Sequence, residues 1–146
     1  GLEARVHSHR HDLAAVRRLR GTRIILTNAP RAYALRVLNA LGVAHWFDAV
    51  LCIEDMQMFG HFRPKPDARM LRRLVARLRV PASRCVLVED TLDHQRAAHR
   101  VGMRTVWMQR FARRGDHSGP TVPRWSMQPG YVDCVARSLR RLLTLR

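Results

Sequence analysis

The sequence predicts an α/β fold with three layers, in which a parallel sheet carries helices on both faces. Two observations support this fold class. Short apolar runs bounded by polar residues are typical of strands that are buried on both faces. These runs alternate along the chain with segments whose apolar residues recur at helical spacing. Such an alternation implies right-handed βαβ crossovers and therefore parallel strands.

The first half of the chain predicts four elements and a loop. The elements are a helix over 10–20 that ends near Gly21, a strand over 23–28, a helix from Ala29-Pro30 to Gly42, and a strand over 49–53. Residues 56–64 predict a loop that exposes Phe59, Gly60 and Phe62.

The second half predicts six more elements around one irregular stretch. Before the irregular stretch they are a helix that starts at Pro66-Asp67 and ends near Leu78, a strand over 86–90, a helix that ends at Gly102, and a strand over 104–108. The irregular stretch covers 109–130. A short edge strand at 131–133 and a terminal helix follow it. The terminal helix is rich in arginine and carries Val135, Leu139 and Leu142.

The charge balance is strongly basic but does not by itself indicate a nucleic-acid partner. The net charge is +16, and 26 of the 27 basic residues are arginine because Lys65 is the only lysine. The arginines are spread over nearly every helical segment without interleaved aromatic residues, which favours solvated faces over a binding stripe. In this background a lysine indicates a position that needs a compact point charge.

The sequence also predicts a cytoplasmic protein without membrane association. No stretch approaches the roughly 18 apolar residues of a membrane span, and the polar N-terminal segment does not resemble a signal peptide. The three cysteines are widely spaced within apolar runs, so we expect buried thiols in a reducing compartment.

Polar residues follow two of the predicted strands and begin one helix. Thr27-Asn28 and Glu89-Asp90 stand at strand ends, and Lys65 stands at a helix start. Because ligands bind outside the carboxyl ends of parallel strands, these side chains predict a phosphate site with a cation held by the carboxylates. The alternative for Asp90 is a cap for the helix that follows it.

The same residues resemble a known family. Ile24–Asn28, Arg63–Asp67 and Val86–Thr91 resemble motifs two, three and four of the haloacid dehalogenase-like hydrolase superfamily, and are most similar to its pyrimidine 5′-nucleotidase-like branch. The resemblance covers about residues 10–108 and implies a Rossmann-like sheet.

The resemblance also implies roles for individual residues. Thr27 and Asn28 would bind the transferring phosphoryl group, and Lys65 would neutralise the phosphate and the nucleophile, so Lys65 and Thr27 are the expected catalytic residues. Asp90 would coordinate Mg²⁺, with Glu89 beside it. The polar or acidic residue that the family places four positions later corresponds to His94, with Asp93 one residue earlier.

Two parts of the family pattern do not occur here. The sequence contains no Asp-x-Asp motif, which would supply the nucleophile, and no helical cap. We therefore expect residues 1–146 to be one partial core domain from the C-terminal part of a longer protein. The intact parent would be a Mg²⁺-dependent phosphate-ester hydrolase that forms a phosphoaspartyl intermediate.

Its substrate would be a small phosphorylated metabolite such as a nucleotide. The chain alone would be inactive and would bind Mg²⁺ weakly or not at all. The alternative is a basic module on a degenerate α/β scaffold that binds nucleic acid or another partner.

In the resembled fold, the strand that carries the missing motif is central and would lie between residues 24–28 and 86–90. Its absence leaves backbone groups that must find other partners. We expect the two strands to pair directly, or a second copy of the chain to cover the gap in a homodimer, and we favour direct pairing.

Overall fold

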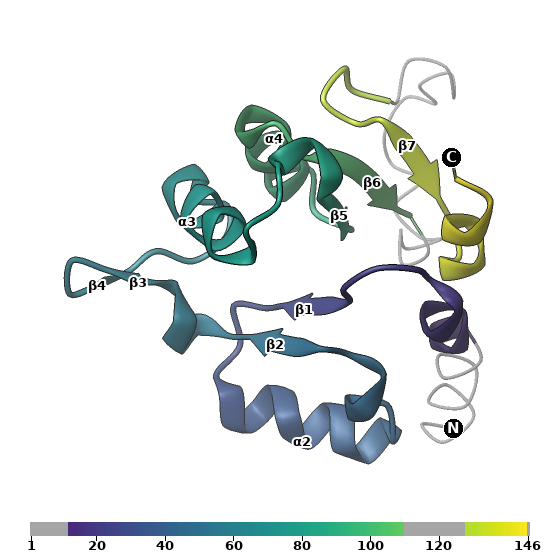
Figure 1. Ribbon diagram of the computed structural model, residues 1–146, viewed down its shortest axis with the longest axis horizontal. Coiled ribbons are helices and arrows are strands. Elements are labelled where there is room, and N and C mark those ends of the chain that lie inside the picture. Colours follow the sequence, from purple (N-terminus) through teal and green to yellow (C-terminus); the bar gives the residue numbers. More distant parts are fainter. Residues whose placement is uncertain (1–11, 110–127, 146) are drawn as a thin grey trace, which may run out of the picture. The chain divides into compact units, whose positions relative to one another are not determined.

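The computed structural model describes residues 12–109 and 128–145. The chain divides into two compact units, which Figure 1 shows in ribbon form. The first contains the described residues of Gly1–Lys65 together with Ser138–Arg146, and the second contains Pro66–Arg137.

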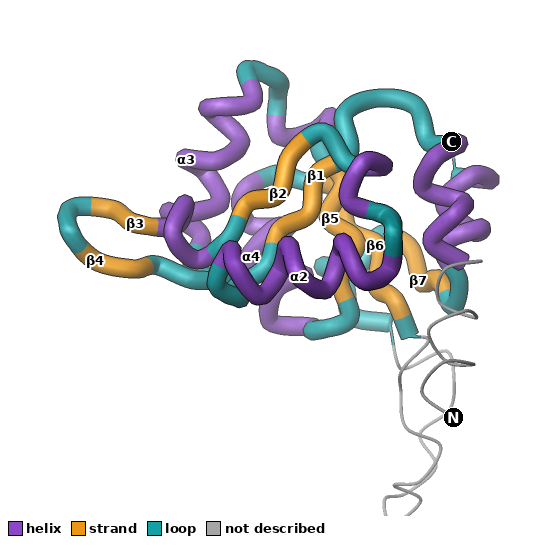
Figure 2. The backbone as a smooth tube through the Cα atoms, turned by 90° about the horizontal axis from the view of Figure 1, so that it is seen from below, coloured by secondary structure: helices purple, strands orange, loops and turns teal. Residues whose placement is uncertain are grey.

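The first unit is built on a parallel pair of strands and a crossover helix. Strands β1 (Ile24–Leu26) and β2 (Ala49–Leu51) pair in parallel, with Ile25 opposite Val50. Helix α2 (Arg31–Leu41) connects them and runs alongside both strands (Figure 2). Its Leu38 is buried with Val43 and Trp46, and Ile25 and Val50 pack against this cluster. The short 3₁₀ helix η2 (Ala44–Trp46) brings Trp46 into that core.

Gly42 ends α2 as the sequence predicts. Its φ of 68° lies in the left-handed region, which glycine adopts without a steric penalty. Val43 follows at once and is fully buried, so the turn after α2 is fixed by packing as well as by backbone conformation.

The expected loop over 56–64 contains a small β-hairpin. After the 3₁₀ helix η3 (Ile53–Met56), strands β3 (Gln57–Met58) and β4 (His61–Phe62) pair antiparallel. Phe59 (φ 53°) and Gly60 (φ 79°) form the turn, and both φ values are those of the primed turns that join tight hairpins. The expected exposure is found, since Phe59 is 92% exposed and Phe62 55%.

The second unit is a three-stranded parallel sheet with two helices. Strands β5 (Val86–Glu89), β6 (Arg104–Met108) and β7 (Cys134–Ala136) lie in that order (Figure 1). Helix α4 (Leu92–Val101) is the crossover between β5 and β6 and packs on both strands. Helix α3 (Ala68–Leu78) packs on α4, and the short η4 (Ala82–Arg84) leads into β5.

The chain ends differ in detail from the expectation. The edge strand is β7 at 134–136, so Val135 belongs to a strand and not to the terminal helix. It begins late because the Asp133 carboxylate itself accepts the hydrogen bond of Thr105 N, at 2.9 Å. The terminal helix is the 3₁₀ helix η6 (Leu139–Thr144), which is shorter than expected. In the described part of the N-terminal segment, Asp12 and Leu13 are helical and are followed by the 3₁₀ helix η1 (Ala14–Arg18).

The α/β fold with parallel strands and helices is confirmed. Within the described residues β1 pairs with β2 in the first unit, and β5 pairs with β6 in the second. Direct pairing of the two motif-bearing strands, which belong to different units, stays a prediction. The irregular stretch expected over 109–130 lies largely outside the described residues. Among those that are described, no helix is long and apolar enough to cross a membrane.

Candidate functional site

Thr27, Asn28 and Lys65 are brought together in the first unit. The Asn28 amide binds the backbone of Lys65 twice, since its Oδ1 accepts from Lys65 N at 2.9 Å and its Nδ2 donates to Lys65 O at 3.1 Å. These residues are 37 positions apart in the chain. These two hydrogen bonds to one residue fix both the position and the orientation of the Lys65 backbone beside the end of β1.

The Lys65 side chain lies on the edge of β1 that faces away from β2. Its Nζ donates to Leu26 O at 3.0 Å. Thr27 N donates to Leu51 O at 3.0 Å and thus points toward β2. Because successive residues of a strand direct their backbone groups to opposite sides, the Leu26 carbonyl points the other way. The ammonium therefore occupies the open edge of β1 at its carboxyl end.

Thr27 and the acids after β2 organise the turn between β1 and α2. Thr27 Oγ1 accepts from Ala29 N at 3.1 Å, which holds the turn closed. Glu54 accepts from Arg31 N through both carboxylate oxygens, at 3.0 and 3.1 Å, so it takes the place of a cap at the N-terminus of α2.

Asp55 has a structural role beside Glu54. It pairs with the Arg31 guanidinium and accepts from Cys52 N at 2.8 Å. Glu54 and Asp55 resemble Glu89 and Asp90 as a strand-end acid pair in sequence, yet they hold α2 in place. The signal that separates the two pairs is Arg31, a cation at a helix start that has Pro30 before it and no capping side chain of its own.

The second acid pair is arranged differently. Glu89 is the last residue of β5, and the exposed Asp90 follows it. Asp90 N donates to Glu89 Oε1 at 3.2 Å, and Trp107 Nε1 donates to Asp90 O at 3.0 Å. The pKa of Asp90 is raised, first because its side chain shares a hydrogen bond with that of Glu89 and then because it is partly desolvated.

Asp90 does not cap the following helix. The N-cap position of α4 is Thr91, and no side chain caps that helix end. The Asp90 carboxylate instead accepts from the Thr91 hydroxyl at 3.3 Å. The capping interpretation is therefore wrong.

His94, and not Asp93, faces the acid pair. His94 Nδ1 lies 3.4 Å from Glu89 Oε2, and both side chains are largely buried, at 16% and 15% exposed. His94 Nδ1 has no hydrogen-bond partner within the described residues. Asp93 is exposed on the first turn of α4.

Gln95 is a positioning residue that the sequence reading missed. Its side chain is fully buried, and Nε2 donates to Glu89 O at 3.1 Å and to Val106 O at 2.9 Å. It thereby joins the carboxyl ends of β5 and β6 directly behind Glu89. The available signal is its spacing, because it lies three residues before Ala98 on the face of α4 that is buried against the sheet.

The donors near Asp90 suit only a loosely held cation. Within the described residues no group of three or more His, Cys, Asp and Glu side chains is placed to hold a metal ion. Two adjacent carboxylates remain, and Mg²⁺ commonly binds one or two carboxylates while keeping several waters. The side chains of Glu89 and Asp90 adjoin each other and share a hydrogen bond, so the residues fit a hydrated Mg²⁺.

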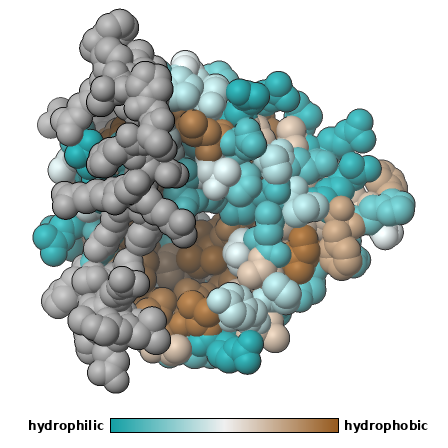
Figure 3. Space-filling view, turned by 180° about the vertical axis from the view of Figure 1, so that it is seen from behind, coloured by the Kyte–Doolittle hydropathy of each residue, from teal (hydrophilic) through white to brown (hydrophobic). Residues whose placement is uncertain are grey.

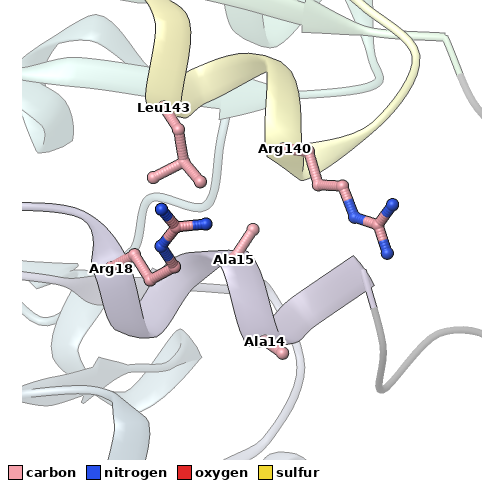
Figure 4. Close-up of a pocket in the computed structure, with 5 residues that line it drawn as sticks. All are labelled: Ala14, Ala15, Arg18, Arg140 and Leu143. Atoms are coloured by element: carbon pink, nitrogen blue, oxygen red, sulfur yellow. The ribbon is translucent and has the colours of Figure 1, made fainter.

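A separate pocket in the first unit contains none of the predicted site residues. It lies between η1 and η6 and is lined by Ala14, Ala15, Arg18, Arg140 and Leu143 (Figure 4). Asp12 holds these two short helices together, since its carboxylate accepts from Leu139 N at 3.0 Å.

On the face shown in Figure 3, hydrophilic side chains cover most of the described surface and apolar ones gather in patches.

Comparison with known proteins gives a consistent result. A family model described as haloacid dehalogenase-like hydrolase matches residues 5–102. The chain is 34% identical over 80 residues to the fructose-1-phosphate phosphatase YqaB of Escherichia coli K12. The aligned region covers 55% of this chain and 40% of that protein.

Solved structures share the fold. A haloacid dehalogenase-like protein of unknown function from Agrobacterium tumefaciens gives a TM-score of 0.67 at 22% identity, over 89% of this chain and 55% of that one. The HAD-hydrolase YfnB of Bacillus subtilis, solved with bound magnesium, gives 0.66 at 18% identity, over 92% and 52%. The chain thus spans about half the length of these structures and 40% of the curated relative.

Proposed function

The chain belongs to the haloacid dehalogenase-like hydrolases, and we propose that it carries the phosphate-binding and cation-binding residues of a Mg²⁺-dependent phosphate-ester hydrolase. Within this proposal Thr27, Asn28 and Lys65 bind the phosphoryl group. Glu89 and Asp90 hold the cation, and the His94 imidazole contacts the Glu89 carboxylate.

The observation that carries the proposal is the placement of Lys65. The Asn28 amide fixes its backbone, and its ammonium lies on the open edge of β1 against a neutral carbonyl. A phosphate oxygen is a stronger partner for an ammonium than a carbonyl, because both groups of the pair are then charged. The Thr27 hydroxyl and the Asn28 amide stand at the same strand end and supply further polar contacts.

In this proposal the carboxylates of Glu89 and Asp90 bind the cation. Bound at Glu89 and Asp90, Mg²⁺ would act as a Lewis acid in the reaction of the intact parent. Gln95 and Trp107 keep the backbone of these two residues in place through their bonds to Glu89 O and Asp90 O. With two carboxylates as protein ligands, binding to this chain alone is expected to be weak.

The nucleophile in this proposal is an aspartate of the intact parent. Its carboxylate oxygen attacks phosphorus, the bond to the leaving oxygen breaks, and that oxygen takes up a proton. Water then cleaves the resulting acyl phosphate and releases inorganic phosphate. Residues 1–146 contain no Asp-x-Asp motif, so the proposal makes this chain inactive alone.

The proposed substrates are small phosphorylated metabolites. A nucleotide agrees with the branch that the motifs resemble, and a sugar phosphate agrees with the name of the E. coli relative. Both classes present the same phosphoryl group to Lys65 and differ in the leaving group. A panel of nucleoside monophosphates and sugar phosphates distinguishes them.

Phosphate release tests the proposal. A longer protein that carries these residues together with a strand ending in Asp-x-Asp is expected to release phosphate from members of the panel, and chelation of Mg²⁺ is expected to abolish the release. The chain of residues 1–146 is expected to release none. Release that survives chelation, or equal release by this chain alone, would contradict the proposal.

A further inference from the structure

Helix α3 of the second unit carries a solvent face made of arginine. Its apolar residues Met70, Leu71, Leu74 and Val75 are buried. The exposed positions of the helix include Arg69, Arg72, Arg73 and Arg77. No Asp or Glu occurs between Ala68 and Leu78. We call these four arginines the α3 arginine face.

Helical geometry puts the four arginines on one side. At about 100° per residue they fall within an arc of about 140°, directly opposite the buried residues. Arg69 stands three and four positions before Arg72 and Arg73, and such like-charge neighbours repel each other. Within the described chain, Arg69, Arg72 and Arg77 have no carboxylate in ion-pair distance. At Arg69, Arg72 and Arg77 the face therefore carries positive charge that no carboxylate of the described residues neutralises.

The general use of arginine in this protein does not account for this face. Helix α2 also has 11 residues and contains two arginines. Arg31 pairs with Asp55, and Arg36 lies over the Tyr33 ring. Preference for arginine over lysine decides which cation is used, but it does not gather four of them on one face of a helix that contains no Asp or Glu.

We propose that the α3 arginine face binds the phosphate backbone of double-stranded nucleic acid, an interaction beyond the proposed hydrolase function. A chain with a net charge of +16 is drawn to such a polyanion over long range. Arg69 and Arg77 are eight residues apart, so the face spans about 12 Å along the helix, enough for about three or four phosphates. Guanidinium groups suit phosphate oxygens because they bind them as planar forks.

Other anionic partners fit this face less well. An amphipathic helix that lies on a membrane must insert its apolar face, and that of α3 is already buried in the unit. Protein interfaces depend on aromatic and apolar anchors, and residues 66–79 contain no aromatic residue. The lack of aromatic side chains also removes the stacking platform used for single strands.

Binding to a random-sequence DNA duplex of about 20 base pairs, measured between about 50 and 200 mM salt, tests the proposal. A slope of log affinity against log salt of about −3 is expected, from about −0.9 for each phosphate. In the variant Arg69→Gln/Arg72→Gln/Arg77→Gln the slope is expected to fall in magnitude by about 2.7. The variant Arg69→Lys/Arg72→Lys/Arg77→Lys keeps the charges and is expected to retain most of the slope.

A matched control removes three exposed arginines from the first unit. The variant Arg18→Gln/Arg20→Gln/Arg140→Gln has the same net charge as the α3 glutamine variant and is expected to change the slope by less than about 1. The α3 glutamine variant is expected to have an unchanged or raised melting temperature, because its substitutions relieve repulsion between the arginines. An equal loss in both variants would show attraction by net charge alone and overturn the proposal.

The remaining outcomes are equally decisive. No duplex binding at about 50 mM salt overturns the proposal. Tighter α3-dependent binding to phosphatidylserine vesicles, to a single strand or to an acidic protein than to the duplex also overturns it. These measurements need no phosphatase activity, so their failure leaves the hydrolase proposal untouched, and failure of the phosphatase assay leaves this one untouched.

Discussion

The residue clusters at the ends of β1 and β5 are both predicted to handle phosphate chemistry, yet they differ in how well the protein satisfies them. The Asn28 side-chain amide makes two hydrogen bonds to the backbone of Lys65, and the Lys65 ammonium donates to the Leu26 carbonyl. Around Glu89, by contrast, two carboxylates adjoin each other, and His94 Nδ1 lies 3.4 Å from Glu89 Oε2 without making a hydrogen bond within the described residues. The first cluster is already organised without a ligand, whereas the second contains two adjoining carboxylates that a cation would stabilise.

This difference predicts that catalysis is most sensitive at Lys65. In a longer protein that supplies the nucleophile, Lys65→Ala is expected to lower kcat by about 100-fold or more, because one preorganised charge next to the phosphoryl group is lost. Lys65→Arg is expected to be poor as well, since a planar fork does not replace a point charge held at a strand edge. Steady-state kinetics measures both.

The control for this prediction is structural. The far-ultraviolet circular dichroism and melting temperature of Lys65→Ala are expected to match those of the parent protein. An arginine variant with full activity would count against the assignment of Lys65 as a point charge for the phosphoryl group.

The next largest effect is expected in the backbone support of the acid pair. Gln95→Ala should lower the free energy of unfolding by about 2–4 kcal/mol, because it leaves a cavity and removes two bonds to buried carbonyls. Gln95→Met keeps most of the side-chain volume but loses both hydrogen bonds that Nε2 donates, so a loss of about 1–3 kcal/mol in the free energy of unfolding is expected. Urea denaturation measures both values, and two neutral variants would show that Gln95 does not support the end of β5.

The support of the phosphate cluster is expected to be weaker, because its hydrogen bonds are exposed. Asn28→Ala removes both bonds to Lys65 and should lower the free energy of unfolding by about 1–2 kcal/mol. Asn39→Ala, at an exposed position in α2, is the matched control and should stay within about 0.5 kcal/mol of the parent. If the two variants lose the same free energy, the Asn28–Lys65 bonds do not organise the cluster.

These comparisons show which parts of the fold and site the sequence predicts. Apolar runs with polar ends locate β1, β5 and β6, and Gly42 and Gly102 mark helix ends, because these features act over a few residues. The Asn28–Lys65 contact is predicted only as proximity, since motif spacing says nothing about which atoms meet. The role of Glu54 and Asp55 depends on Arg31, more than twenty residues earlier, and a local pattern does not reveal that pairing.

The gap expected beside β1 shows the same limit. Direct pairing of β1 with β5 stays a prediction, because the two strands belong to different units. The Leu26 carbonyl is satisfied by the Lys65 side chain, an alternative to strand pairing that period-two patterns cannot signal. Cover of the gap by a second copy of the chain stays a prediction.

The smallest effect concerns the ionisation of Asp90. Its raised pKa means that the folded chain binds this proton more tightly than the unfolded chain does. The resulting stability is fully present below the unfolded value of about 3.9 and is lost as the pH rises through the folded value. Asp90→Asn should remove this dependence, so the stability of the variant relative to the parent should increase from acid to neutral pH.

Carboxyl NMR titration checks the cause. Glu89→Gln should bring the pKa of Asp90 down toward its ordinary value, because the Glu89 side chain is the largest cause of the shift. Millimolar Mg²⁺ should also lower the pKa of Asp90, while K⁺ at matched ionic strength should not. A pKa that responds to neither change would contradict the cation site.

The most direct test of the phosphate cluster uses the fact that Lys65 is the only lysine in the chain. In protein labelled with ¹³C in lysine, the side chain of Lys65 gives a single set of signals. Titration with inorganic phosphate is expected to shift the Lys65 Cε signal together with the backbone amides of Thr27, Asn28 and Ala29, along one saturation curve, and Lys65→Ala should remove the amide shifts. An unchanged Lys65 signal at phosphate concentrations that shift arginine resonances elsewhere would contradict the account.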